Sequence, residues 1–129
     1  MIISKLVVLA AFTFLSHFSF SQKYQGDSWT TVKANGSGVL TVVYSEQFGL
    51  VYKDKDGKVK GVCVDILSDF TRYIKEKYGK TVTVKYAGEI PVFSVFLSTS
   101  QNTPNILGVT NTTITEDRKK ILKFSPPYM

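Results

Sequence analysis

The strongest constraint on the fold is an alternation of short β-branched runs with a stretch of helical periodicity. Val39–Tyr44, Thr81–Tyr86 and Ile106–Val109 are typical of strands. Val64–Tyr78 repeats apolar residues at three- and four-residue spacing and is followed by Gly79, so it predicts an amphipathic helix. Strands that alternate with helices form parallel sheets flanked by helices, and ligands bind at the carboxyl ends of such strands. The sequence therefore predicts an α/β fold.

Two further elements are expected between these segments. Leu50–Lys53 and Lys58–Lys60 flank Asp54–Gly57, a turn sequence typical of a β-hairpin. Its Asp-x-Asp-Gly pattern does not make a calcium loop, because the glycine comes too early and the later acidic ligands are missing. Pro91 fits the first turn of a short helix over Pro91–Leu97, in which three apolar side chains are expected to pack inward: Phe93, Phe96 and Leu97.

A run of small hydroxyl residues follows the third predicted strand and carries the most informative chemistry. Thr115 is expected to cap a brief helix whose first turn holds Glu116 and Asp117, and Leu122–Phe124 is expected to form another strand. Hydroxyls and backbone N–H groups at a helix N-terminus bind anions, and the guanidinium of Arg118 can grip a carboxylate through two parallel hydrogen bonds. The alternative is a surface helix start with a solvated Arg118.

Residues 1–21 have the layout of a secretory signal peptide. One positive charge at Lys5 precedes the apolar run Leu6–Leu15, and Ser19 and Ser21 place small residues where a signal peptidase cleaves. The apolar run is shorter than the stretch of about 20 residues that crosses a membrane, and an uncleaved anchor is the alternative. We therefore expect a soluble, exported protein from which residues 1–21 are removed.

Cleavage would remove His17, the only histidine, and leave Cys63 as the only cysteine. Such a chain cannot supply Ser-His-Asp or Cys-His catalysis, a Cys/His zinc site or an internal disulfide. Cys63 lies far from the cleavage point, so no lipid can be attached there, and it is most simply a small buried apolar residue. We expect no catalytic residue, no metal and no cofactor.

The exported part of the chain is large enough for one small domain and too small for two. Residues 22–37 are polar, with glycine and serine punctuation, and are expected to form a leader strand or a loose arm before the domain at residues 38–129. Fifteen Lys and Arg residues then oppose ten Asp and Glu residues. They are scattered and no nucleic-acid-binding motif accompanies them, so at most they favour anionic ligands or an acidic partner surface.

Four motifs follow one another in the domain: Val39–Val43, Asp56–Lys58 with Gly61–Leu67, Asn111–Arg118, and Phe124–Tyr128. Together they resemble the first lobe of the bacterial extracellular solute-binding proteins of family 3, which are the polar-amino-acid receptors of ABC importers. The Thr-x-x-Arg segment followed by Phe-Ser-Pro-Pro-Tyr is the more specific part of the resemblance, which covers nearly all of the exported chain.

The resemblance implies one lobe of a type II periplasmic-binding-protein clamshell. Such a protein closes on a small ligand in the periplasm without catalysing a reaction and delivers it to the membrane subunits of an ABC transporter. In this family the arginine of the segment holds the α-carboxylate of the ligand, which maps to Arg118. Thr113 and Asn111 map to positions that hold the carboxylate and amino groups. The expected ligand is a polar amino acid or a similar small carboxylate.

The chain departs from the family pattern after the first strand, where members often carry Pro-Phe and this chain has Phe-Gly-Leu. Phe48 is the candidate for the aromatic wall beside the ligand, and a position in the core is its alternative. The alternative is that Glu46 or Gln47 faces the pocket instead, where a carboxylate would favour a cationic ligand. Asn105 stands in the region where the family tends to place an aspartate.

A clamshell has two lobes, so we expect this chain to be a lobe truncated before the second one. A lone lobe exposes the face that the other lobe covers and loses half of the ligand contacts, so high affinity is not expected. Two other functions use the same lobe type and remain alternatives. One is a periplasmic dehydratase or a lytic transglycosylase, and the other is the ectodomain of a membrane sensor kinase.

Overall fold

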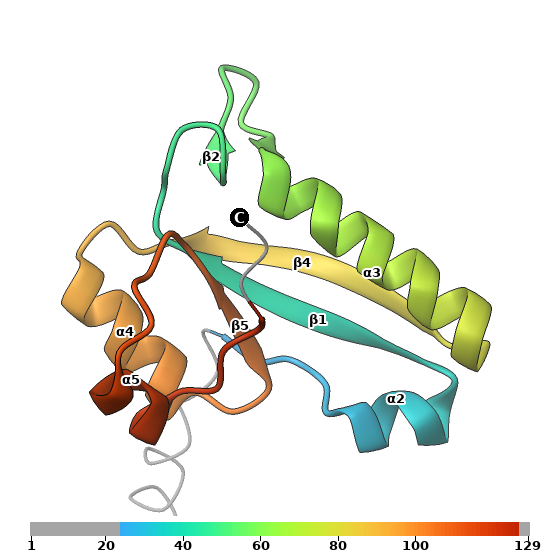
Figure 1. Cartoon of the computed structure of the whole chain (residues 1–129). Helices are drawn as coiled ribbons and strands as arrows, with labels where there is room; N and C mark the ends of the chain where they lie inside the picture. The colour runs from blue at the N-terminus through green and yellow to red at the C-terminus, as the bar shows by residue number, and fades with distance from the viewer. Residues whose placement is uncertain (1–23, 127–129) are drawn as a thin grey trace, which may run out of the picture.

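The computed structural model describes residues 24–126, and the predicted signal peptide lies outside them. A three-stranded parallel sheet forms the centre, and a small two-stranded hairpin stands beside it (Figure 1). The described elements run in this order: α2 (Trp29–Asn35), β1 (Ser37–Tyr44), β2 (Tyr52–Lys53), β3 (Val59–Lys60), α3 (Val62–Tyr78), β4 (Thr81–Glu89), α4 (Phe93–Asn102), β5 (Ile106–Val109) and α5 (Glu116–Ile121).

The sheet has the order β4-β1-β5, so the first strand in the sequence is the central one. β1 pairs in parallel with β4 along its whole length, and the register shifts between Val42 and Val43. It pairs in parallel with β5 over its last four residues, Thr41–Tyr44. The predicted α/β fold with a parallel sheet is therefore confirmed. The central position of β1 explains why its sequence is almost continuously apolar, since both of its faces are covered.

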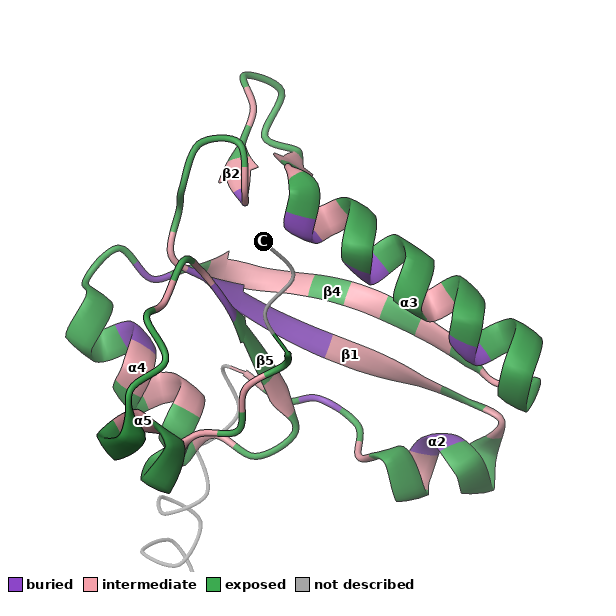
Figure 2. Ribbon diagram, in the orientation of Figure 1, coloured by how far each residue is buried: buried purple, intermediate pink, exposed green. Residues whose placement is uncertain are grey.

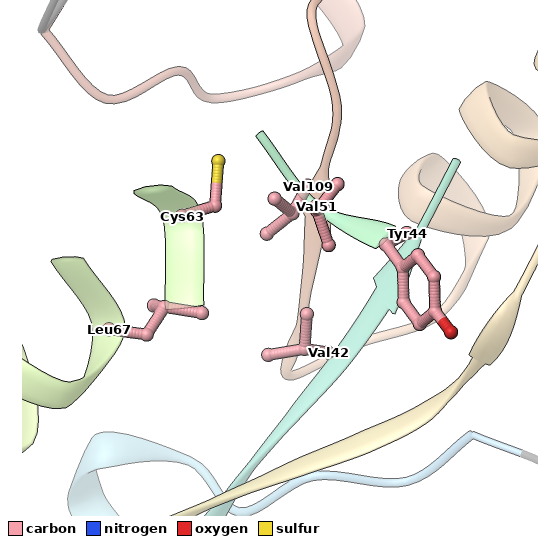
Figure 3. Packing of buried hydrophobic residues seen from close by; sticks show 6 residues of the cluster. All are labelled: Val42, Tyr44, Val51, Cys63, Leu67 and Val109. Atoms are coloured by element: carbon pink, nitrogen blue, oxygen red, sulfur yellow. The ribbon is translucent and has the colours of Figure 1, made fainter. Parts of the chain in front are cut away.

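Two hydrophobic clusters lie on opposite faces of the sheet, because successive side chains of β1 point in opposite directions. Val42 and Tyr44 belong to the larger cluster, on the α3 side (Figure 3). Val43 belongs to the smaller cluster, on the α4 side, where it meets Ile90 and Phe96. Figure 2 shows that burial is concentrated in the second half of β1. The core thus sits under the carboxyl ends of the strands.

Several local predictions are confirmed in detail. β5 has the predicted bounds, and the amphipathic helix α3 ends at Gly79, which adopts the left-handed conformation. Thr115 caps α5 by accepting a hydrogen bond from the backbone N–H of Arg118. Cys63 is buried in the larger cluster, as predicted for a small apolar side chain. Within residues 24–126, none of the helices has the length and apolar character needed to cross a membrane.

The segment before β1 differs from the prediction of a leader strand or a loose arm. Ser28 caps the seven-residue helix α2, in which Val32 is buried. Asp27 and Val39 make two hydrogen bonds with each other. The backbone N–H of Asp27 donates to the carbonyl of Val39, and the backbone N–H of Val39 donates to the carboxylate of Asp27. Thr41 in β1 donates its hydroxyl to the carbonyl of Gln25. Polar composition misled the prediction, because capping and side-chain hydrogen bonds fix this segment.

Leu122–Phe124 was expected to form a strand, and this prediction is wrong. Leu122 has an extended backbone (φ −131°, ψ 147°), but residues 122–126 belong to no strand of the described chain. An extended segment becomes a strand only when a neighbouring strand pairs with its N–H and C=O groups. The sequence therefore predicted the extended backbone that Leu122 adopts, but it could not predict that a partner strand is lacking.

Candidate functional site

The carboxyl ends of the three parallel strands meet at one edge of the sheet. The carbonyl of Tyr44, at the end of β1, accepts a hydrogen bond from the backbone N–H of Ile90, just after β4. On the other side, the N–H of Ser45 donates to the carbonyl of Val109, the last residue of β5. The loops that follow β1, β4 and β5 therefore start side by side. Ligands of open parallel sheets bind at this edge.

Arg118 lies in α5, beyond the loop that follows β5, and its side chain folds back over that loop. Its Nη1 donates a hydrogen bond of 2.7 Å to the backbone carbonyl of Thr113. Its guanidinium carbon lies 5.3 Å from the ring centre of Phe93, which is a cation–π distance. These two contacts orient the guanidinium and leave most of its five N–H donors for a further partner.

No carboxylate neutralises Arg118 within residues 24–126, although acidic residues are its neighbours in the sequence. Glu116 pairs with Lys119 at 2.8 Å, and Asp117 pairs with Lys120 at 2.8 Å. All four of these side chains are mostly exposed, whereas Arg118 is half-buried. The one half-buried cation of this helix is therefore the one that retains an unneutralised charge, which suits it to bind an anionic group.

The helix N-terminus contributes less to an anion site than the sequence suggested. α5 has only six residues, and the hydroxyl of Thr115 already accepts from the backbone N–H of Arg118 at 3.3 Å. Glu116 and Asp117 place two carboxylates in the first turn, where they offset the positive end of the helix. The guanidinium of Arg118, rather than the N-terminus of the helix, is therefore the group at this place that is suited to an anion.

Thr113 and Asn111 lie in the same loop as predicted, and both are exposed. The structure brings Thr113 to Arg118 through its backbone carbonyl rather than through its hydroxyl. Thr112, which the sequence analysis did not single out, has a buried hydroxyl oxygen without a hydrogen-bond partner in the described chain. The hydroxyl run is thus present beside Arg118, with one hydroxyl turned inward and two side chains turned outward.

Phe48 and Gln47 lie in the turn that follows β1. Phe48 is 88% exposed, so the alternative of a core position is wrong. Its ring centre lies 5.0 Å from that of Tyr52, and both rings line an open hollow whose walls all come from residues 46–55. Gln47 shapes the turn through its backbone, which donates to the carbonyl of Val51 at 2.7 Å. Glu46 is held by the backbone N–H of Lys53 at 2.7 Å.

Phe93 is the contact of Arg118 that sequence reasoning missed. It was expected to pack inward with Phe96 and Leu97, but only Phe96 is fully buried, at 3% exposed. Phe93 is 36% exposed and stacks on Phe96 with ring centres 6.2 Å apart, so that its other side is available to Arg118. A signal existed in the sequence, since an aromatic residue in the first turn of a helix after a parallel strand must lie at the ligand edge.

Two tyrosines near this edge stay protonated at neutral pH. Burial, and then the charges of Glu89 and Glu46, raises the pKa of Tyr44 above its usual value. Burial is also the main reason why the pKa of Tyr86 is raised. The rings of Tyr44 and Tyr86 meet edge to face, 6.4 Å apart. In the part of the chain that the structure describes, no group of three or more His, Cys, Asp or Glu residues is placed to hold a metal ion.

Several solved structures have a fold similar to that of this chain. The substrate-binding protein of a polar amino acid ABC uptake transporter from Streptococcus thermophilus matches with a TM-score of 0.56 and 23% identity, over 88% of this chain and 38% of that chain. A variant of domain 1 of TmArgBP, in its arginine-bound form, matches with a TM-score of 0.53 and 23% identity, over 79% and 72%. An ancestral cyclohexadienyl dehydratase matches with a TM-score of 0.50 and 22% identity, over 88% and 41%.

No protein-family profile and no curated protein matches the chain. The sequence spans well under half of the transport protein and of the dehydratase, but most of the single domain. Less than half of a whole protein but most of a single domain is the share that one lobe of a two-lobed protein would have. The chain therefore has the fold of one lobe of the amino-acid-binding proteins of ABC uptake transporters, which is the family that its sequence resembles.

Proposed function

We propose that this chain is the ligand-binding first lobe of an extracytoplasmic solute-binding protein, which captures a polar amino acid or a similar small carboxylate for an ABC importer. The observation that carries the proposal is the half-buried Arg118 at the carboxyl edge of the sheet, which is held by Thr113 and Phe93 and lacks a carboxylate partner in the described chain. A guanidinium fixed in this way offers two parallel N–H donors to a carboxylate.

The neighbouring groups suit the other end of an amino acid. Backbone carbonyls and the side-chain oxygens of Asn111 and Thr113 are acceptors that an ammonium group requires. Phe48 and Tyr52 provide exposed aromatic surface on the next loop along the edge. Periplasmic export by the predicted signal peptide and delivery to membrane subunits complete the proposal. No covalent step is required, so the chain is proposed to be a non-enzyme.

The test is a titration of a protein of residues 22–129 with each of the twenty L-amino acids, in which binding is monitored by nuclear magnetic resonance of the backbone amides. Domain 1 of TmArgBP exists in an arginine-bound form, so a single lobe is a reasonable object for this experiment. We expect that a small set of amino acids changes the amide chemical shifts, and that these changes are confined to residues 45–52, 91–93 and 110–118. No response to any of the twenty would refute the amino-acid class.

Two variants separate the geometry of the guanidinium from its charge. Arg118→Lys keeps the charge but loses the two-pronged hydrogen bonding, so we expect affinity to fall by about tenfold or more. Lys119→Gln removes a charge from the neighbouring position, where the side chain is exposed and paired with Glu116, and we expect less than about a twofold effect. Equal binding by the wild type and Arg118→Lys would remove Arg118 from the site.

A dehydratase-like enzyme is the second candidate, because one of the matched structures is an ancestral cyclohexadienyl dehydratase. The two candidates differ in the fate of the ligand. A binding protein returns its ligand unchanged after denaturation, whereas an enzyme of the dehydratase kind eliminates water, and with it any carboxylate expelled in the same step as carbon dioxide, and returns a lighter product. Mass spectrometry of the bound ligand therefore separates them.

A further inference from the structure

Three aromatic rings gather on the surface where α2 meets the last turn of α3, at the amino ends of β1 and β4 (Figure 1). The backbone N–H of Thr81, at the start of β4, donates to the carbonyl of Gly36, just after α2, so the two regions are held together. Trp29 and Tyr78 meet edge to face with ring centres 5.2 Å apart, and Tyr73 meets Tyr78 at 6.3 Å. Each of the three side chains is between 40% and 46% exposed.

Positive charge is concentrated at the same end of the molecule. Residues 29–37 and 72–81 together hold five basic residues and one acidic residue, a net charge of +4. The rest of residues 22–129 holds ten basic and nine acidic residues, a net charge of only +1. Asp69 neutralises Arg72 at a distance of 2.7 Å. The other four basic side chains of this end have no carboxylate partner in the described chain: Lys33, Lys75, Lys77 and Lys80.

The lysines alone do not require a partner. Lysine is favoured in the last turn of a helix, where its charge offsets the negative end of the helix dipole, and both α2 and α3 carry it there. This effect does not account for the exposed rings beside the charges. Lys77 combines the two, since its ammonium group donates to the hydroxyl of Tyr73 at 2.6 Å and lies 5.1 Å and 5.5 Å from the ring centres of Tyr73 and Tyr78.

We propose that the three rings and the four lysines, which we call the amino-end patch, bind a bilayer surface that carries anionic phospholipid headgroups. Tryptophan and tyrosine favour the membrane–water interface, because their rings are apolar while their N–H and O–H groups are polar. The lysines attract the phosphate groups, and each lysine near an anionic surface strengthens binding about fivefold. The predicted signal peptide would bring the chain to the outer side of such a membrane.

Binding at the amino-end patch leaves the ligand edge free. The amino ends of parallel strands lie opposite their carboxyl ends, so the patch is at the other end of the sheet from the loops that follow β1, β4 and β5 (Figure 1). The lobe therefore rests on the membrane through one end and presents the other end to a ligand. The proposal does not depend on Arg118 or on the identity of the ligand.

Binding to lipid vesicles tests this assignment, with a protein of residues 22–129 whose fold is checked by circular dichroism. We expect it to sediment with vesicles of phosphatidylglycerol, which is anionic, and not with vesicles of phosphatidylcholine, which has no net charge. High salt should weaken the binding, because it screens exposed charges. Trp29 is the only tryptophan of the chain, so its fluorescence reports on the patch directly. We expect its emission to move to shorter wavelength as the exposed ring leaves water.

Two double variants with the same change in net charge locate the contact. Lys33→Gln with Lys80→Gln removes two charges from the amino-end patch, and we expect binding to phosphatidylglycerol vesicles to fall about tenfold or more. Lys33→Gln with Lys75→Gln serves instead should the first variant fail to fold. Lys119→Gln with Lys120→Gln is the control in α5, where both side chains are exposed and paired with carboxylates, and we expect less than about a twofold loss.

Three results would each overturn the proposal: equal binding to phosphatidylcholine vesicles, equal losses in the patch and control variants, or an unchanged emission of Trp29 in the vesicle-bound protein. Stronger binding to soluble polyglutamate than to phosphatidylglycerol vesicles would identify an acidic protein as the partner, and would likewise overturn it. No amino-acid ligand enters these measurements, so the proposed function can fail or hold independently.

Discussion

The attachment of the N-terminal segment to the sheet can be tested by removing one hydroxyl. Thr41 is completely buried in β1, and its hydroxyl donates a hydrogen bond of 2.6 Å to the carbonyl of Gln25. Thr41→Val keeps the shape of the side chain, so it creates no cavity. It removes one hydrogen bond and leaves the carbonyl to find another donor, and we expect a loss of about 1–2 kcal/mol in the free energy of unfolding.

Urea unfolding followed by two probes measures this loss. Circular dichroism reports the whole domain, while fluorescence reports α2, because Trp29 is the only tryptophan of the chain and its ring lies 5.2 Å from that of Tyr78. Each 1 kcal/mol should also lower the melting temperature by about 4–8 °C in a domain of this size. We expect both probes to shift together, because α2 is part of the folded domain.

The control is Thr83→Val, the same change at an exposed position of β4, which should alter stability by less than about 0.5 kcal/mol. If Thr41→Val were as stable as the wild type, the hydrogen bond to Gln25 would not hold the segment. If fluorescence changed at a lower urea concentration than circular dichroism in the wild type, α2 would be a separate unit and the reasoning would be wrong.

Two further predictions concern the hairpin and the start of α3. Gly61 has φ 122°, and a Cβ atom added there would point at the carbonyl of Leu50, so Gly61→Ala should lower the free energy of unfolding by about 3 kcal/mol or more. Gly57 has φ 78° but lies in open space, so Gly57→Ala should lower it by only about 1–2 kcal/mol. Equal losses of the two variants in urea unfolding would contradict the close approach at Gly61. The hydrogen bond from Lys60, and then that from the backbone of Lys58, lowers the pKa of Asp54 from its usual value. The folded state therefore gains stability from Asp54 at pH values above the pKa of this carboxyl in the unfolded chain, and it loses that stability as the pH falls through the pKa in the folded protein. Asp54→Asn should abolish this part of the dependence of stability on pH. A titration of the Asp54 carboxyl by nuclear magnetic resonance that gave an unshifted pKa would disprove the prediction.

The order of the elements from β1 to α5 and the parallel sheet could be predicted because the strand and helix patterns are encoded locally. The apolar runs of β1 and β5, the stripe of α3 and the cap at Thr115 each depend on residues a few positions apart. Arg118 could be singled out for the same reason, since a guanidinium among hydroxyl residues is visible in the sequence. The contact that orients it could not, because Phe93 is 25 residues away and its neighbour is decided by the packing of α4 against the sheet.

The sequence by itself determined most of the helical and extended segments, with helix α2 as the exception, and which side chains carry charge, because these properties arise from neighbouring residues. Only the tertiary structure decided how segments distant in the sequence meet. It placed Phe48 in solvent, tied the polar segment before β1 to Val39 and Thr41, and left Leu122–Phe124 without a partner strand. It also left one side of α3 apolar and exposed. The burial of a side chain and the pairing of a strand depend on which distant segments pack against them, and neighbouring residues in the sequence do not carry that information.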